Sequence, residues 1–167
     1  MEVLHKIRKG IDFALSSACA VIFGAMVVIG TYQILTRFIF RRPSTVLEEL
    51  LTYSFTWMAL LASAYVFGKR DHMRMGFAAD KLGKAGRKVL NIISEILIVI
   101  LAASVMIYGG VTIMDLTMTQ STASLGIPMG VVYTIIPLSG VLIVIYSILN
   151  LVDLIAGVER TQREVKE

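Results

Sequence analysis

The amino-acid sequence predicts an all-α membrane protein with four transmembrane helices. Hydrophobic residues make up 56% of the 167 positions and charged residues only 17%, and the mean hydropathy is +0.77. A water-soluble domain of this length could not bury so much apolar surface, whereas a lipid bilayer accommodates it. Four apolar runs are each long enough to cross the hydrocarbon core, which takes about 20 helical residues. They should be helical because lipid offers the backbone no hydrogen-bond partners.

The predicted spans follow one another along the whole chain. The first run begins FALSSACAVIFGAMVVIG and exceeds the roughly 7–15 apolar residues of a signal-peptide core, so we expect a retained span. Pro137 is expected to kink the fourth span, because proline removes a helical hydrogen bond. Residues 1–167 are thus predicted to form a single four-helix transmembrane domain. The spans cover residues 13–35, 50–67, 89–114 and 131–156.

Basic residues are distributed unevenly between the two sides of this predicted bundle. Thirteen of the sixteen Lys and Arg lie in the N-terminus, in the loop between spans two and three, or in the C-terminus. The other three lie in the first loop, and the third loop has none. Segments rich in Lys and Arg remain in the cytoplasm. We therefore expect both termini and the middle loop on the cytoplasmic side.

The middle loop, GKRDHMRMGFAADKLGKAGRK, permits two interpretations. Met73, Phe77 and Leu82 could face lipid while the lysines and arginines reach headgroups, which would make it a short, partly helical interfacial segment. A solvated basic loop that only fixes the orientation fits the sequence equally well.

Glu48 and Glu49 stand at the start of the second apolar run, where charge is expensive. Thr45 and Glu48 have the spacing of a capping box, with Thr45 as the N-cap, and carboxylates in a first turn favour the positive end of the helix dipole. We expect Glu49 to contact Arg37 or a cation of a partner chain, because pairing lowers the cost of a charge near lipid.

Small and polar residues recur at spacings of three and four along the second span. Such a stripe allows helices to approach closely in a membrane. It could contact the other helices of this chain, but the charged end of the stripe favours a protein neighbour. The stripe comprises Thr45, Glu48 or Glu49, Thr52, Thr56, Ala59 and Ser63.

Residue patterns of catalytic or metal sites are absent from the sequence. His5 and His72 are far apart and outside any metal-ligand spacing, and there is no glycine-rich phosphate loop. Glu95, Asp115 and Asp153 lie near predicted span ends, where charges at the membrane interface are ordinary. We therefore expect no enzymatic activity, no cofactor and no metal.

Two blocks of the sequence together form a distinctive pattern. The first is RFIFRRPSTVLEELLTYSFTWMALLASAYVFGKRDHMRM and the second is STASLGIPMGVVYTIIPLSG. Both blocks resemble the small membrane subunit, or Q-subunit family, of tripartite ATP-independent periplasmic (TRAP) transporters. The resemblance covers essentially the whole chain. Matching positions in the first block are Arg37, Phe38, Pro43, Ser44, Glu48, Glu49, Tyr53, Phe55, Trp57 and His72, and those in the second are Ala123, Leu125, Ile127, Pro128, Tyr133, Pro137 and Gly140.

The resemblance implies a non-catalytic subunit of the bacterial inner membrane. Members of the family pair with a large membrane subunit for sodium-coupled uptake of a carboxylate, such as a sialic acid or a C4-dicarboxylate, that a periplasmic binding protein delivers. The small subunit is expected to scaffold the large one. Candidate interface residues are Arg37, Glu48, Glu49, Thr52, Thr56, Trp57, Ser63 and His72.

An alternative function is a stand-alone small four-helix transporter that acts as a homodimer. Such exporters usually carry a glutamate in the middle of the first span for proton coupling. Residues 13–35 contain no charge, and Gln33 is the sizeable polar residue there. This difference favours the scaffold.

Overall fold

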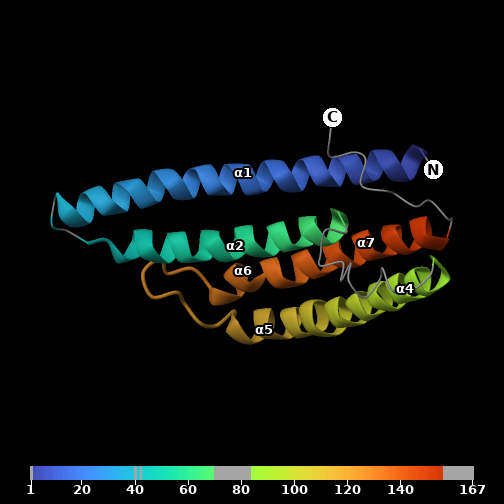
Figure 1. The fold of residues 1–167 in the computed structure, drawn as a ribbon. Helices are drawn as coiled ribbons and strands as arrows, with labels where there is room; N and C mark the ends of the chain where they lie inside the picture. The colour runs from blue at the N-terminus through green and yellow to red at the C-terminus, as the bar shows by residue number, and fades with distance from the viewer. Residues whose placement is uncertain (1, 40, 42, 70–83, 156–167) are drawn as a thin grey trace.

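The structure of this protein is a computed structural model, and it describes residues 2–39, 41, 43–69 and 84–155 (Figure 1). The named elements within these residues are all helices, with four long apolar helical stretches as predicted. The first two are α1 (Glu2–Phe38) and α2 (Thr45–Lys69). The third joins α4 (Lys84–Leu101), the π-helix η1 (Ala102–Gly109) and α5 (Gly110–Thr117), and the fourth joins α6 (Met129–Tyr133) and α7 (Ile135–Ile155).

The stretches that could cross a membrane extend slightly beyond most of the predicted runs. They are Lys6–Phe38, Thr45–Lys69, Lys88–Thr117 and Met129–Leu154. The predicted cytoplasmic position of both termini stays a prediction, but the start of α1 and the end of α7 do lie at the same end of the bundle (Figure 1). The predicted interfacial segment and His72 lie within residues 70–83, outside the described part of the chain.

The helices are stacked side by side in the order α1, α2, α7 and the third stretch (Figure 1). The fourth stretch is the most buried of the four. Of the residues in its most apolar 18-residue segment, 39% are buried, compared with 6% in the corresponding segment of the first stretch. Its core contacts include Leu15 of α1 and Leu61 of α2, which pack with Ile135 and Tyr146 of α7. Because α1 packs mainly on α2, most of its apolar surface is left for lipid or for another protein.

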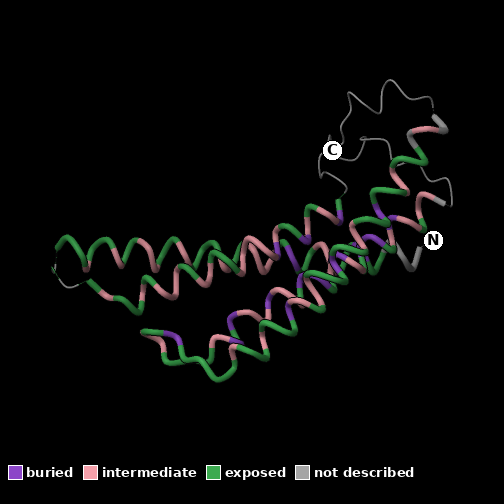
Figure 2. Tube along the Cα trace, turned by 90° about the horizontal axis from the view of Figure 1, so that it is seen from below, coloured by how far each residue is buried: buried purple, intermediate pink, exposed green. Residues whose placement is uncertain are grey.

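Buried residues are concentrated in one half of the α1–α2 pair (Figure 2). On the described part of α1, the buried residues are Arg8 and Leu15, and on α2 they are Leu61, Ala64 and Gly68. All five lie toward the end where α1 begins and α2 ends. In the other half, α2 makes polar contacts with the fourth stretch and with the loop before it, described below.

The third and fourth stretches approach each other closely because glycines face the opposite helix. A Cβ atom on Gly140 would lie 2.8 Å from the Cβ atom of Met106, and one on Gly110 would lie 2.9 Å from Cδ of Pro137. Close approach of this kind is how membrane helices gain packing energy without a hydrophobic driving force.

The fourth stretch is interrupted as the proline predicted. α6 ends at Tyr133, Thr134 forms a turn, and α7 begins at Ile135, two residues before Pro137. Proline has no N–H group and its ring displaces the carbonyl four residues earlier, so the regular ladder cannot pass through this point. The wide π-helical turns of η1 lie beside the interrupted segment in the neighbouring stretch.

Candidate functional site

Helix α2 presents two different faces. Glu49, Tyr53 and Trp57 follow one another at a spacing of four, so they lie on one side of the helix, and all three contact the fourth stretch or the loop before it. We call these three residues the inward ladder. A second set is solvent-accessible in the isolated chain, and we call it the outward face. It comprises Glu48, Thr52, Thr56 and Ser63.

Glu49 accepts hydrogen bonds from three donors. Its Oε1 atom accepts from the hydroxyl of Tyr53 at 2.7 Å, and its Oε2 atom accepts from the backbone N–H groups of Ser124 at 2.7 Å and Leu125 at 2.9 Å. An ionised carboxylate is an acceptor with two oxygens, so this set of donors suits it. Glu49 therefore ties the start of α2 to a loop that lies 75 positions further along the chain.

The bound loop is itself well ordered by hydrogen bonds. We call residues 118–128 the outer loop, after the side on which the sequence predicts it. The buried side chain of Thr122 accepts the N–H of Ile127 at 3.1 Å, and the N–H of Thr122 donates to the carbonyl of Ile127 at 2.8 Å. Gly126, with φ of +67°, supplies the left-handed turn between them.

The predicted contact between Glu49 and Arg37 is wrong for this structure. Arg37 is exposed in the last turn of α1, and in the described part of the chain no ion pair joins it to Glu48 or Glu49. The sequence places three arginines shortly before Glu48 and Glu49. It does not show that backbone N–H groups of the outer loop donate hydrogen bonds to the Glu49 carboxylate. A contact of Glu49 with a partner-chain cation stays a prediction.

The predicted capping box is also wrong. Helix α2 already begins at Thr45, and the carbonyl of Ser44 accepts the N–H of Glu48 at 3.4 Å. The helix therefore starts one residue too early for Thr45 to be its N-cap. Among the described contacts, neither the Thr45 hydroxyl nor the Glu48 carboxylate binds the other residue's backbone. Glu48 is exposed and remains an acidic residue in the first turn.

Trp57, a candidate interface residue in the sequence analysis, lies toward the fourth stretch. Its indole Nε1–H donates to the carbonyl of Val132 at 3.0 Å, and the side chain is half-buried against the core of the bundle. Val132 lies in α6, directly before the interruption. The polar atom of Trp57 is thus used within this chain.

The three hydroxyl-bearing residues of the outward face are small, and their hydroxyl groups are satisfied. Each hydroxyl donates to the carbonyl four residues earlier on α2: Thr52 to Glu48 at 2.9 Å, Thr56 to Thr52 at 3.0 Å, and Ser63 to Ala59 at 2.8 Å. A helix can pack closely on such a surface without leaving a buried polar group unpaired. The predicted stripe is therefore divided, since Glu49 turns inward and the other polar members stay accessible.

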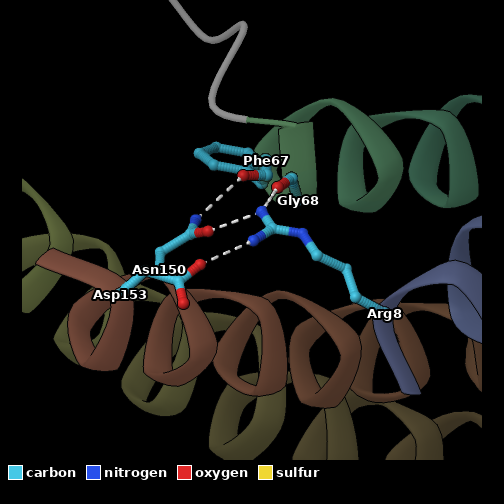
Figure 3. Close-up of polar contacts among 5 residues, drawn as sticks. All are labelled: Arg8, Phe67, Gly68, Asn150 and Asp153. Atoms are coloured by element: carbon cyan, nitrogen blue, oxygen red, sulfur yellow. Dashed lines mark hydrogen bonds and ion pairs between the residues drawn. The ribbon is translucent and has the colours of Figure 1, made fainter. Parts of the chain in front are cut away.

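A second polar site lies at the opposite end of the bundle and was not predicted (Figure 3). Arg8 of α1 donates to Asp153 at 3.2 Å and to the side-chain oxygen of Asn150 at 2.7 Å, and it also donates to the carbonyl of Gly68. Asn150 in turn donates to the carbonyl of Phe67 at 3.4 Å. We call these five residues the Arg8 cluster.

In the Arg8 cluster, side chains of α1 and α7 cap the C-terminal end of α2. The last carbonyls of a helix have no partner within it and carry partial negative charge, so a guanidinium group is a favourable cap. Beside the cluster, the hydroxyl of the fully buried Tyr146 donates to Asp12 of α1. The sequence did not indicate this role, because Arg8 and its partner Asp153 lie 145 positions apart. In the sequence analysis Arg8 counted only as one of the basic residues that set the predicted orientation.

Metal-ligating groups are dispersed in the described residues. There, no three side chains among His, Cys, Asp and Glu lie close enough together to hold a metal ion. Of the other candidate residues, Asp115 is exposed at the end of α5. The polar side chains brought together by the fold therefore serve to join helices, and their geometry is that of inter-helix anchors.

Comparison with known proteins identifies the same family as the sequence motifs. A family model described as "Tripartite ATP-independent periplasmic transporters, DctQ component" matches residues 6–157. A Haemophilus influenzae protein classed by name as a TRAP transporter small permease is 24% identical over 153 residues, which cover 92% of this chain and 94% of that protein. A Vibrio cholerae protein named the sialic acid TRAP transporter small permease protein SiaQ is 27% identical over 109 residues, which cover 65% of this chain and 61% of that protein.

Proposed function

We propose, from the premise that this chain belongs to the DctQ component family of tripartite ATP-independent periplasmic transporters, that it is a rigid scaffold for the large transport subunit. As the small permease component of such a transporter, it is a multi-pass protein of the bacterial inner membrane and a transporter subunit, not an enzyme. Its proposed partners are the large membrane subunit, with which it forms a heterodimer, and a periplasmic substrate-binding protein.

The observation that carries this proposal is the outward face of α2. All four side chains are exposed in the isolated chain, and Thr52, Thr56 and Ser63 are small and have their hydroxyl donors already satisfied. Beside these three residues a partner helix could therefore approach closely without leaving a buried hydroxyl group unpaired. We propose that the outward face and the exposed Arg37 in the last turn of α1 contact the large subunit.

The contacts at the interruption of the fourth stretch favour a scaffold over a transporter with its own substrate site. In secondary transporters, interrupted membrane helices often line the substrate site. Here the interruption before Pro137 is covered by close contact with Gly110 on one side, and Trp57 donates to a carbonyl beside it. The irregular backbone is thus filled by this chain's own residues, which favours mechanical support as its role.

We also propose a chemical class for the transported substrate. We propose that the complex takes up a carboxylate, such as a sialic acid or a C4-dicarboxylate, in a sodium-coupled manner. The family and the name of the Vibrio cholerae relative support this choice.

Co-purification with the large subunit tests the proposed interface. In the Thr56→Leu/Ser63→Leu variant, bulky side chains should hold the partner helix away, and the recovery of the large subunit should fall several-fold. The matched control is Ser104→Leu/Thr112→Leu on the third stretch, where two exposed hydroxyls also donate to their own helix. Recovery should be unchanged in the control. Loss in the control but not in the first variant would move the interface to the third stretch.

A further inference from the structure

The carboxylate of Glu49 is held by neutral donors. Its Oε2 atom accepts the backbone N–H groups of Ser124 at 2.7 Å and Leu125 at 2.9 Å, and its Oε1 atom accepts the hydroxyl of Tyr53 at 2.7 Å. In the described part of the chain no ion pair involves Glu49, and the outer loop contains no charged residue. Successive backbone N–H groups that converge on one point form a concavity that binds anions. The arrangement therefore binds a carboxylate through the directions of its donors.

The outer loop is closed on itself by hydrogen bonds that do not involve this carboxylate. The N–H of Met129 donates to the carbonyl of Gln120 at 2.8 Å, and the N–H of Thr122 donates to the carbonyl of Ile127 at 2.8 Å. The buried hydroxyl oxygen of Thr122 accepts the N–H of Ile127 at 3.1 Å. Because these contacts lie within the loop, the donors at its tip should keep their directions when the carboxylate is removed.

We propose that the outer loop and Tyr53 form a binding site for a small carboxylate, and that the side chain of Glu49 is the ligand that fills it. The donors come from α2 and from a loop far along the chain, so a carboxylate in the site joins these two elements. All three contacts are donated by the protein, which suits a group that only accepts hydrogen bonds. The proposal concerns this chain alone and does not depend on any partner or on the scaffold function.

The atoms of the glutamate side chain indicate which free ligand fits. Glu49→Ala keeps Cβ and removes the Cγ methylene group and the carboxylate, which together correspond to one acetate ion. Acetate can therefore return both acceptor oxygens to the site. Acetamide has nearly the same shape, but an NH₂ group replaces one oxygen, so it cannot accept hydrogen bonds on both sides.

Rescue of Glu49→Ala by acetate tests the site. The readout is hydrogen–deuterium exchange of the outer loop in the full-length protein in detergent, with sodium acetate or sodium chloride at the same ionic strength and pH. In chloride the loop should exchange faster than in the wild type, because two of its N–H groups have lost their acceptor. Acetate should slow the exchange in a saturable manner, by about tenfold at about ten times its Kd, and acetamide should not.

Three controls show whether acetate acts in the proposed site. In the wild type the tethered carboxylate of Glu49 competes at high local concentration, so acetate should have no effect. In Glu49→Gln the glutamine side chain occupies the space, and acetate should again have no effect. Glu48→Ala removes the same atoms from the adjacent, exposed residue and should not respond either. Equal exchange of the Glu49→Ala loop in acetate and chloride would overturn the proposal, as would an equal response in Glu48→Ala.

Recovery of folded protein provides a second readout. If Glu49→Ala yields no monodisperse protein in chloride, the variant is purified with acetate present throughout. Recovery in acetate but not in acetamide would support the site, because the free ligand would then replace the lost contact during folding. Failure to recover the protein in acetate as well would overturn the proposal.

Discussion

The Oε2 atom of Glu49 lies 2.9 Å from the backbone nitrogen of Leu125, a residue 76 positions further along the chain. This contact explains why one of two adjacent carboxylates stands at the mouth of an apolar helix. Glu49 satisfies backbone donors of the outer loop, whereas its neighbour Glu48 is exposed on the outward face. Adjacent residues of the same type thus have different environments because they lie about 100° apart around the helix.

Glu49→Gln should loosen the outer loop, and Glu48→Gln should not. Glutamine keeps one acceptor oxygen but replaces the other with an NH₂ group, which cannot accept from Tyr53 or from the two loop N–H groups. Maleimide labelling of Ala123→Cys should therefore be faster in the Glu49 variant. Equal labelling in the two variants would show that the carboxylate of Glu49 does not hold the loop.

Arg8→Ala should destabilise the bundle strongly. The substitution leaves Asp153 without its ion-pair partner and removes the cap on Gly68, and removing one partner of a buried ion pair typically costs about 3–5 kcal/mol. Lys9→Ala is the control, because Lys9 is the exposed neighbour of Arg8. The thermal unfolding midpoint in detergent should fall markedly for Arg8→Ala and little for Lys9→Ala. Similar midpoints for both variants would show that the Arg8 cluster contributes little.

Gly68→Ala should disturb the same end of the bundle by a steric route. A Cβ atom at this position would lie 2.6 Å from two ring carbons of the fully buried Tyr146, so helices α2 and α7 would have to separate. Overpacking of this kind costs about 1–3 kcal/mol. In Gly24→Ala the new methyl group meets nothing within 4 Å, and the helix should gain about 0.5–1 kcal/mol. The yield of monodisperse protein in detergent should fall for Gly68→Ala and should not fall for Gly24→Ala. An unchanged yield for Gly68→Ala would show that the contact with Tyr146 can relax.

Cysteine labelling in intact cells tests the predicted orientation. Single cysteines introduced at Thr119 and at Lys84 should label from opposite sides of the membrane, with Lys84 on the cytoplasmic side, because thirteen of the sixteen basic residues belong to that side. An impermeant maleimide should therefore reach the residue at position 119 only. Labelling of both positions from outside would refute the four-span orientation.

The long helices could be predicted because membrane insertion depends on local sequence. The predicted start of the third run at residue 89 is one residue from the observed Lys88, and the predicted start of the second run at residue 50 is five residues after Thr45. The second difference arises because the polar first turn of α2 does not belong to an apolar run. Pro137 likewise predicted the interruption of the fourth stretch, because the effect of proline on a helix is local.

The contacts between helices could not be predicted in the same way. The Arg8–Asp153 pair and the binding of Glu49 to the outer loop join residues that are far apart in sequence, and charge spacing along the chain does not encode them. A signal for the inward ladder was available, because Glu49, Tyr53 and Trp57 share one helix face. The π-helix η1 has no comparable signature in a uniformly apolar run.

Uptake by proteoliposomes tests most directly whether this chain is a scaffold without transport activity of its own. Vesicles would contain this chain alone, the large subunit alone, or both, with the periplasmic binding protein loaded with a radiolabelled carboxylate outside and an inward sodium gradient. We predict sodium-dependent uptake only when both membrane subunits are present. Uptake by vesicles that contain this chain alone, or full uptake by the large subunit alone, would contradict the scaffold function.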